Sequence, residues 1–348
     1  MLLDEIRKYG HFSIYGAHVA AYGAYRAIRE LTGRTPDCFI VSRAEGNLPS
    51  VDNIPVQALD AVPKSSAIVA GVTELLQEEI ISILRNAGYE NIVPMGNRAE
   101  YLLMRAYFDA IGEFPALDTS RNADPKDLAL YEVRNHRDTP LKKHPELFPF
   151  EHAIQAGAAI SDKRVAAVLD NTGDNISERN RQYCEMTASY WVWKHTDNAW
   201  KGIEHYRRHL LVDPRMLDDG VDAVLPLPFV CWPDTMVHLR WFVSENVLNA
   251  MLHALQTLHP VEYPVYWKIL NGHWQYPCNM LAARKSVYDD YCAWFFHITE
   301  YMETLTEIAP EIATTRALSY VAEVLTNLYF LSHRDELRIR HVEKEIYT

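Results

Sequence analysis

The sequence predicts an α/β protein of two domains, the first of them built on a parallel sheet. Its 348 residues exceed one typical domain. In the first third, short apolar runs alternate with helical patterns, as in parallel sheets with crossover helices. A polar segment containing prolines then separates two patterned regions, which is typical of a linker. We therefore expect a small Rossmann-like domain at 1–115, a linker at 116–126 and a second α/β domain at 127–348.

The composition excludes several classes of protein. A formal net charge of -12 disfavours nucleic acid as a partner, because such binders need a basic surface. No apolar run reaches the roughly 18 residues of a transmembrane helix, and the first residues lack the pattern of a secretory signal. We expect a cytoplasmic protein. Its five scattered cysteines, without a CxxC pair, favour reduced thiols over disulfides or a zinc site.

The first domain begins with a β-turn-α unit that turns at Gly16 and ends its helix near Gly33. Further apolar runs predict strands at 37–42, 66–72 and 91–95, with a helix at 78–88. This alternation predicts a parallel sheet with right-handed crossovers.

A dinucleotide site in this domain is disfavoured. The fingerprint G-x-G-x-x-G fails because His18 stands where the second glycine should admit pyrophosphate. Val41 and Ser42 occupy the end of the second strand, where a ribose-binding acid belongs. The sequence favours a structural or regulatory role, with a ligand site at the 16–22 turn as the alternative.

The second domain opens with a strand, about 128–136, and a polar loop at 137–150, a usual position for ligand contacts. A turn rich in short polar groups follows, and then a helix with a core-facing aromatic stripe. Asp170, Asp174, Asn175 and Asn180 surround that turn. Such groups bind sugar hydroxyls or cap the chain, and the sequence leaves both open. Asn175 or Ser177 can serve as the helix N-cap.

The segment 200–210 resembles a strand with an arginine on each face. Strict alternation places Ile203, His205, Arg207 and His209 on one side, and Glu204, Tyr206 and Arg208 on the other. Arginines beside histidines can neutralise a diphosphate through paired hydrogen bonds. A surface patch of salt bridges is the alternative.

A later helix carries Arg316, Tyr320, Glu323 and Asn327 at i, i+4, i+7 and i+11, and so on one face. Such a stripe is usually solvated. The apolar residues around it favour the alternative, a partly buried helix in which polar groups need partners, and the sequence leaves both open.

Several motifs, in this order, resemble a family of capsular-polysaccharide and exopolysaccharide glycosyltransferases that has been catalogued as a domain of unknown function. They are GDNISERNRQYCEMTASYWVWKH at 173–195, GIEHYRRHL at 202–210, DAVLPLP at 222–228, NMLAARKSVYDDYCAWFFHI at 279–298 and R-x-x-x-Y-x-x-E at 316–323. The resemblance covers about 127–335. It implies a GT-A-like fold, a nucleoside-diphosphate sugar donor such as a UDP-galactose form, and a saccharide or lipid-linked saccharide acceptor in surface-polysaccharide assembly.

The resemblance also implies roles for named residues. The substrate-binding candidates are Asp170, Asp174, Asn175, Ser177, Asn180, Tyr183, Glu185, Asn279 and Arg316, with His205, Tyr206, Arg207 and Arg208 facing the diphosphate. Arg207 or Arg208 suits stabilisation of the departing diphosphate. Glu323, Asp174 and His205 are the candidates for taking the acceptor proton, and the sequence does not rank them.

Metal dependence is left open by the sequence. Many GT-A enzymes hold Mn²⁺ or Mg²⁺ on an Asp-x-Asp motif, which this chain lacks. Either arginine charge replaces the metal, the interpretation that we favour, or Asp170 and Asp174 form an atypical site.

Two other functions remain as alternatives, a nonenzymatic nucleotide- or sugar-binding module and a phosphate-transfer or hydrolytic enzyme. A lipid-linked acceptor would add peripheral contact with the inner face of the membrane. The oligomeric state stays open.

Overall fold

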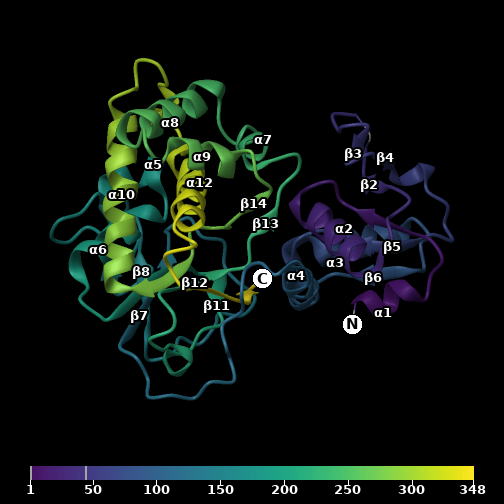
Figure 1. Cartoon of the computed structure of the whole chain (residues 1–348), viewed down its shortest axis with the longest axis horizontal. Coiled ribbons are helices and arrows are strands. Elements are labelled where there is room, and N and C mark those ends of the chain that lie inside the picture. Colours follow the sequence, from purple (N-terminus) through teal and green to yellow (C-terminus); the bar gives the residue numbers. More distant parts are fainter. Residues whose placement is uncertain (1, 44) are drawn as a thin grey trace. The chain divides into compact units, whose positions relative to one another are not determined.

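The computed structural model describes residues 2–43 and 45–348, which divide into two compact units (Figure 1). Among the described residues, unit 1 comprises 2–43, 45–115, 229–233 and 348, and unit 2 comprises 116–228 and 234–347. The segment predicted as a linker has no helix or extended strand, and its start is held within unit 2. Ala116 forms an isolated β-bridge with His341, and Leu117 packs into a core cluster with Leu128 and Leu130.

Unit 1 contains a six-stranded sheet in the order β3-β4-β2-β1-β5-β6. All its pairs are parallel except β3 with β4, so the predicted Rossmann-like parallel sheet is confirmed. The strands are β1 (Phe12–Tyr15), β2 (Phe39–Val41), β3 (Ser50–Val51), β4 (Ile54–Ala58), β5 (Ala67–Ala70) and β6 (Ile92–Pro94). The helices are α1 (Leu2–Arg7), α2 (Val19–Thr32), α3 (Glu74–Asn86), α4 (Asn97–Ile111) and the 3-10 turn η1 (Leu59–Ala61); β13 (Phe229–Val230) also lies in this unit.

The turn from β1 to α2 depends on Gly16. Its φ of 109° lies in a region that side chains with a Cβ rarely adopt, and a Cβ here would lie 2.7 Å from the carbonyl oxygen of Gly71. Helix α2 ends at Gly33, as predicted, in a left-handed C-cap. Helix α4 and the β3–β4 hairpin are not predicted by the patterns found in the sequence.

Unit 2 contains a larger mixed sheet in the order β16-β12-β15-β10-β7-β8-β9, in which β15 runs antiparallel to its neighbours β10 and β12. The short strands β11 and β17 extend from β10. The bounds of the strands in this sheet are β7 (Leu128–Arg134), β8 (Glu151–Gln155), β9 (Val168–Leu169), β10 (Trp200–His205), β11 (Arg208–Leu210), β12 (Ala223–Pro226), β15 (Leu281–Arg284), β16 (Ile339–Val342) and β17 (Lys344–Ile346). The short strand β14 (Trp274–Gln275) lies outside it.

Helices α6 and α10 pack against each other and against β10, and α12 contacts α10 and α9 (Figure 1). The helices of unit 2 are α5 (Asn180–Tyr183), α6 (Met186–His195), α7 (Thr235–Leu239), α8 (Glu245–Leu258), α9 (Tyr263–Leu270), α10 (Lys285–Glu303), α11 (Glu311–Thr314) and α12 (Ala317–Ser332), with 3-10 turns η2 (Ala158–Ile160), η3 (Ser177–Arg179) and η4 (Pro214–Met216). None of the helices in the described ranges combines the length and the apolar character needed to cross a membrane.

The strict alternation predicted for 200–210 is wrong. Strand β10 ends at His205, the chain turns at Tyr206 and Arg207, and β11 returns antiparallel, with His205 paired to Arg208. Because this hairpin reverses the chain, His209 lies beside Glu204, with 3.3 Å between Nδ1 and Oε1.

The order of the strands creates a switch point between β7 and β10. From β7 the chain proceeds outward through β8 and β9, and then returns to the other side of β7 as β10. The pairs β7–β8 and β7–β10 are parallel, so the carboxyl ends of these strands share one edge. Ligands of open α/β sheets bind in the crevice outside such an edge, at the switch point.

Candidate functional site

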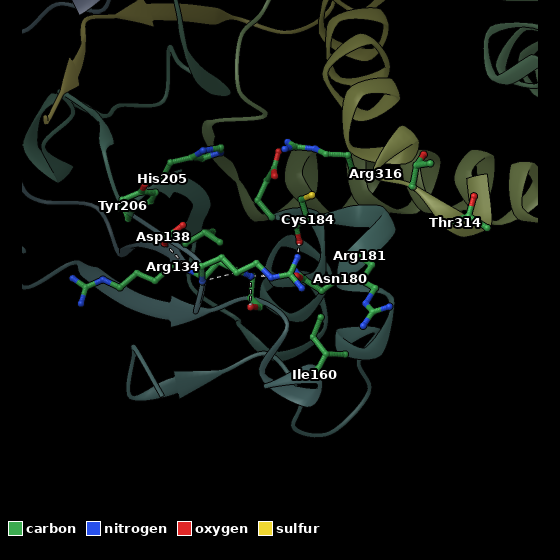
Figure 2. A pocket seen from close by; sticks show the side chains of 16 residues that line it. Arg134, Asp138, Ile160, Asn180, Arg181, Cys184, His205, Tyr206, Thr314 and Arg316 are labelled. Carbon is green, nitrogen blue, oxygen red and sulfur yellow. Dashed lines mark hydrogen bonds between the residues drawn. The ribbon is translucent and has the colours of Figure 1, made fainter. Parts of the chain in front are cut away.

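A cavity of about 590 Å³ lies at this switch point, entirely within unit 2 (Figure 2). Arg134 and Asn135 reach it from the end of β7, Ala156 from the end of β8, and His205 and Tyr206 from the end of β10. Its volume falls within the range of roughly 300–1,000 Å³ that is usual for small-molecule sites.

Four arginines line the cavity: Arg134, Arg137, Arg181 and Arg316. Arg134 forms an ion pair with Glu132. Within 2–43 and 45–348, no carboxylate forms an ion pair with any of the other three. The walls therefore carry positive charge that a bound anion can neutralise.

The loop after β7 contributes Asp138, which the sequence analysis did not single out. Its Oδ2 accepts a hydrogen bond from the Asn135 backbone N–H at 2.6 Å. Burial raises the pKa of the Asp138 carboxyl to about 6, against the opposing effects of this hydrogen bond and of Arg207. The feature of the sequence that could have indicated Asp138 is the polar run directly after the first strand of the second domain.

Glu185 is held in the cavity wall by a chain of hydrogen bonds. Asn279 Nδ2 donates to Glu185 Oε1 at 2.8 Å, and Thr326 Oγ1 donates to Asn279 Oδ1 at 2.9 Å. Asn279 is only 1% exposed and does not line the cavity, so its role is to orient Glu185.

Glu323, on α12, lies near Glu185. Burial, and then the Glu185 charge, raise the pKa of Glu323 to about 7, while the Cys278 backbone, Arg208 and Arg316 oppose this rise. Burial lowers the pKa of His205, which favours the neutral imidazole at pH 7. His205 Nε2 is buried without a hydrogen-bond partner in the part of the chain that the structure describes.

The backbone around Glu185 is strained at three residues other than glycine. Cys184 has φ 49° and ψ -123°, and Cys278 and Asn279 have φ 67° and 52°. Such conformations cost about 1–3 kcal/mol each and cluster at functional sites. This region is therefore the best candidate for the reactive end of the cavity.

The structure brings together only some of the residues predicted from the sequence. Those that line the cavity are Asn180, Glu185, His205, Tyr206 and Arg316. Arg208 and Glu323 lie close enough to perturb groups at its Glu185 end, and the Arg207 guanidinium stacks 4.6 Å from the centre of the Tyr206 ring.

The polar turn predicted as a donor site is mostly a structural cap. Asp170 is fully buried and accepts hydrogen bonds from the Gly157 and Ala158 backbone and from the Ser177 and Thr187 hydroxyls. These bonds occupy both of its carboxylate oxygens, which leaves the residue unsuited to hold a metal.

The other candidates from this turn and its helix also lie outside the cavity. Asp174 is exposed and accepts a hydrogen bond from the Tyr190 hydroxyl, and Asn175 Oδ1 accepts one from the Ser177 backbone N–H. Tyr183 is buried in contact with Phe296.

Unit 1 has a smaller cavity of about 440 Å³ near the carboxyl ends of β2 and β4. Ser42, Arg43, Asp60 and Lys64 are among the residues that line it. The turn at 16–22 does not contribute to it.

Unit 2 has a GT-A-like α/β fold, and in the chain it follows the Rossmann-like unit. The chain belongs to the family described as "Domain of unknown function (DUF4422)", whose model matches residues 132–334. Its fold is similar to that of the apo structure of WbbM, described as a bifunctional glycosyltransferase, with a TM-score of 0.53 and 22% sequence identity. The match covers 64% of this chain and 45% of the WbbM chain, so it spans less than half of that protein. No curated protein matches the chain.

Proposed function

We propose that this protein is a glycosyltransferase that uses a nucleoside-diphosphate sugar. The observation that carries the proposal is the cavity lined by four arginines at the switch point of the unit 2 sheet, three of them without an ion pair within the described ranges. Guanidinium groups bind diphosphate oxygens through paired hydrogen bonds, and the volume suits a nucleotide sugar. The likeness of the fold to that of WbbM supports the same class.

Arginine, rather than a metal, neutralises the diphosphate in this proposal. The chain has no Asp-x-Asp motif, and across the described ranges no three metal-binding side chains converge at the cavity. The residues present therefore do not fit the Mn²⁺ or Mg²⁺ of many GT-A enzymes. Arg208, with His205 beside it, stabilises the charge that develops on the departing diphosphate.

Glu185 accepts the proton of the acceptor hydroxyl in this mechanism. It is a carboxylate of the cavity wall, and the strained residues surround it. Glu323 lies next to Glu185, and burial together with the Glu185 charge raises the pKa of Glu323 to about 7. Asp174, a candidate for this role from the sequence, lies outside the cavity and therefore does not take it.

The finer assignment follows from the family resemblance. We propose a UDP-hexose such as a galactose form as donor, and as acceptor a saccharide, free or lipid-linked, of a capsular or other surface polysaccharide. The enzyme would act in the cytoplasm, with peripheral membrane contact when the acceptor is lipid-linked.

Binding of UDP tests the arginine site. We expect Arg181→Ala and Arg316→Ala each to weaken UDP binding about 10-fold or more, because a hydrogen bond to a charged group contributes roughly 1.5–3 kcal/mol. Uridine, which has no phosphate, should bind the variants and the wild type alike. Isothermal titration calorimetry measures both ligands.

Arg240→Ala is the matched control, because Arg240 pairs with Glu245 and does not line the cavity. Unchanged UDP affinity in Arg181→Ala and Arg316→Ala would contradict the diphosphate site. UDP binding without transfer of any hexose to saccharide acceptors would favour a binding module instead.

A further inference from the structure

A second group of ionisable side chains is buried in unit 2, on the face of the sheet opposite His205. Glu132 lies on β7, Glu151 on β8, Glu204 on β10 and His209 on β11, and all four are buried. Glu132 and Glu204 are register partners in neighbouring parallel strands, so they share a face. His205 follows Glu204 directly and therefore points to the other face.

Three ligand atoms converge in this group. Glu151 Oε1 and Glu204 Oε1 lie 3.9 and 3.3 Å from His209 Nδ1, and the group offers one ligand atom from each residue within 4.8 Å of one another. Ligands placed about 2.1 Å from a tetrahedral metal ion are about 3.4 Å apart. The observed distances are thus close to those of a metal site before it contracts around an ion.

The second oxygen of each of these carboxylates is fixed by the backbone. The Leu210 N–H donates to Glu204 Oε2 at 3.0 Å, and the Phe148 N–H donates to Glu151 Oε2 at 2.8 Å. Glu204 is fully buried, yet its Oε1 has no hydrogen-bond partner in the part of the chain that the structure describes. A buried oxygen without a partner is costly, and a cation would satisfy it.

Glu132 occupies the position of a supporting carboxylate. Its Oε2 lies 3.2 Å from His209 Nε2, and Arg134 pairs with its other oxygen. A histidine that binds a metal usually donates its second ring N–H to a carboxylate, which fixes the tautomer. A proton on Nε2 leaves the lone pair of Nδ1 facing Glu151 and Glu204.

The composition of the group also suits a cation. Three buried carboxyl groups share the site with one histidine, and Arg134 pairs with one of them. A divalent cation bound there would offset the cost of burying these carboxylates. We propose that Glu151, Glu204 and His209 bind a structural divalent transition-metal ion, of the Zn²⁺ or Mn²⁺ class, with Glu132 as the positioning residue for His209. Imidazole and carboxylate together suit these ions. The ion would join β7, β8, β10 and β11 and would not contact the substrate.

Metal binding by the full chain tests the site directly. Protein freed of metal by a chelator is titrated with Zn²⁺, Mn²⁺ and Co²⁺ and freed of excess ion; the metal content is then measured by mass spectrometry and the Co²⁺ spectrum by visible absorption. We expect about one tightly bound equivalent in the wild type and none in Glu204→Gln. Glu132→Gln should bind about 10–100-fold more weakly, since loss of a supporting partner has effects of that size. Glu345→Gln, the exposed register partner of His209, should match the wild type.

Thermal unfolding, measured with and without metal, tests the proposal independently and also shows whether each variant folds. Metal should raise Tm of the wild type and leave Tm of Glu204→Gln unchanged, because binding to the native state alone stabilises it. Without metal, Glu204→Gln should be at least as stable as the wild type, since it replaces a buried ionisable carboxyl group by a neutral amide. A wild type that takes up no ion, or a Glu204→Gln variant that binds like the wild type, would overturn the site.

Discussion

Replacing Glu323 by glutamine is expected to raise the free energy of unfolding at pH 8 by about 3 kcal/mol. The folded-state pKa of Glu323 is about 7, against an ordinary value of 4.5. At pH values between 4.5 and 7, the Glu323 carboxyl is protonated in the folded state and deprotonated in the unfolded state. Stability from the neutral carboxyl is therefore fully present below pH 4.5 and lost as pH rises through 7. At about 1.36 kcal/mol per pKa unit, the difference is about 3 kcal/mol above pH 7.

The charges that face Glu323 come from several segments. Glu185 raises its pKa, whereas Arg208, Arg316 and the Cys278 backbone lower it. Glutamine keeps the shape of the side chain and an oxygen that accepts from the Cys278 backbone, so the substitution removes mainly the charge. A gain in stability on removal of the charge is expected if the enzyme retains a destabilising carboxylate because its activity needs it.

Urea unfolding at pH 5 and pH 8 measures the effect. The gain in stability of Glu323→Gln should be small at pH 5 and about 3 kcal/mol at pH 8. Glu336→Gln, an exposed glutamate just beyond α12, serves as the control and should show no such change with pH. The prediction would be contradicted if Glu323→Gln and the wild type differed equally in free energy of unfolding at pH 5 and pH 8. It would also be contradicted if the variant were less stable than the wild type at pH 8.

The stripe on α12 shows what periodicity can establish. The spacing of Arg316, Tyr320, Glu323 and Asn327 correctly predicts a helix, and α12 carries the last three of these residues, with Arg316 at its N-cap. It does not decide whether this stripe meets water, because burial depends on segments distant in sequence. In the structure, Asn327 is fully buried, donates to the Trp274 carbonyl and accepts from the Tyr276 N–H.

The hairpin after β10 marks where sequence reasoning failed. Tyr206 and Arg207 form the turn, yet neither is among the residues that usually signal one. The predicted strand was therefore continued past His205, where β10 ends, and this placed His209 on the wrong face of the sheet. The buried group around His209 could not be predicted, since its carboxylates come from three other strands.

Short polar residues in turns were equally ambiguous. In the structure, Asp138 comes after β7 and Asp170 directly after β9, but only Asp138 lines the cavity. Asp170 instead holds two backbone N–H groups and two hydroxyls. Sequence identifies such residues as caps or ligands, and only the fold shows which donors reach them.

Glu185→Gln is expected to lower kcat of sugar transfer by about 10²–10⁴, the usual contribution of a general base. Glutamine retains an Oε1 that accepts the hydrogen bond of Asn279, so the geometry of the cavity should persist while the basic group is lost. Because the arginines are untouched, affinity for the nucleoside diphosphate should stay near that of the wild type. A fall in kcat with unchanged binding is the result that distinguishes a lost base from a collapsed site.

Release of nucleoside diphosphate from the donor in the presence of acceptor measures kcat, and calorimetry measures binding of UDP. Glu178→Gln, an exposed glutamate seven residues earlier, should behave as the wild type in both assays. If Glu185→Gln keeps full activity and Asp138→Asn loses it, the proton acceptor is Asp138, whose pKa of about 6 also suits that task. Because Asp138 follows β7 and Glu185 precedes α6, that result would move the acceptor hydroxyl toward the loop after β7 and leave the strained residues with a role in shape alone.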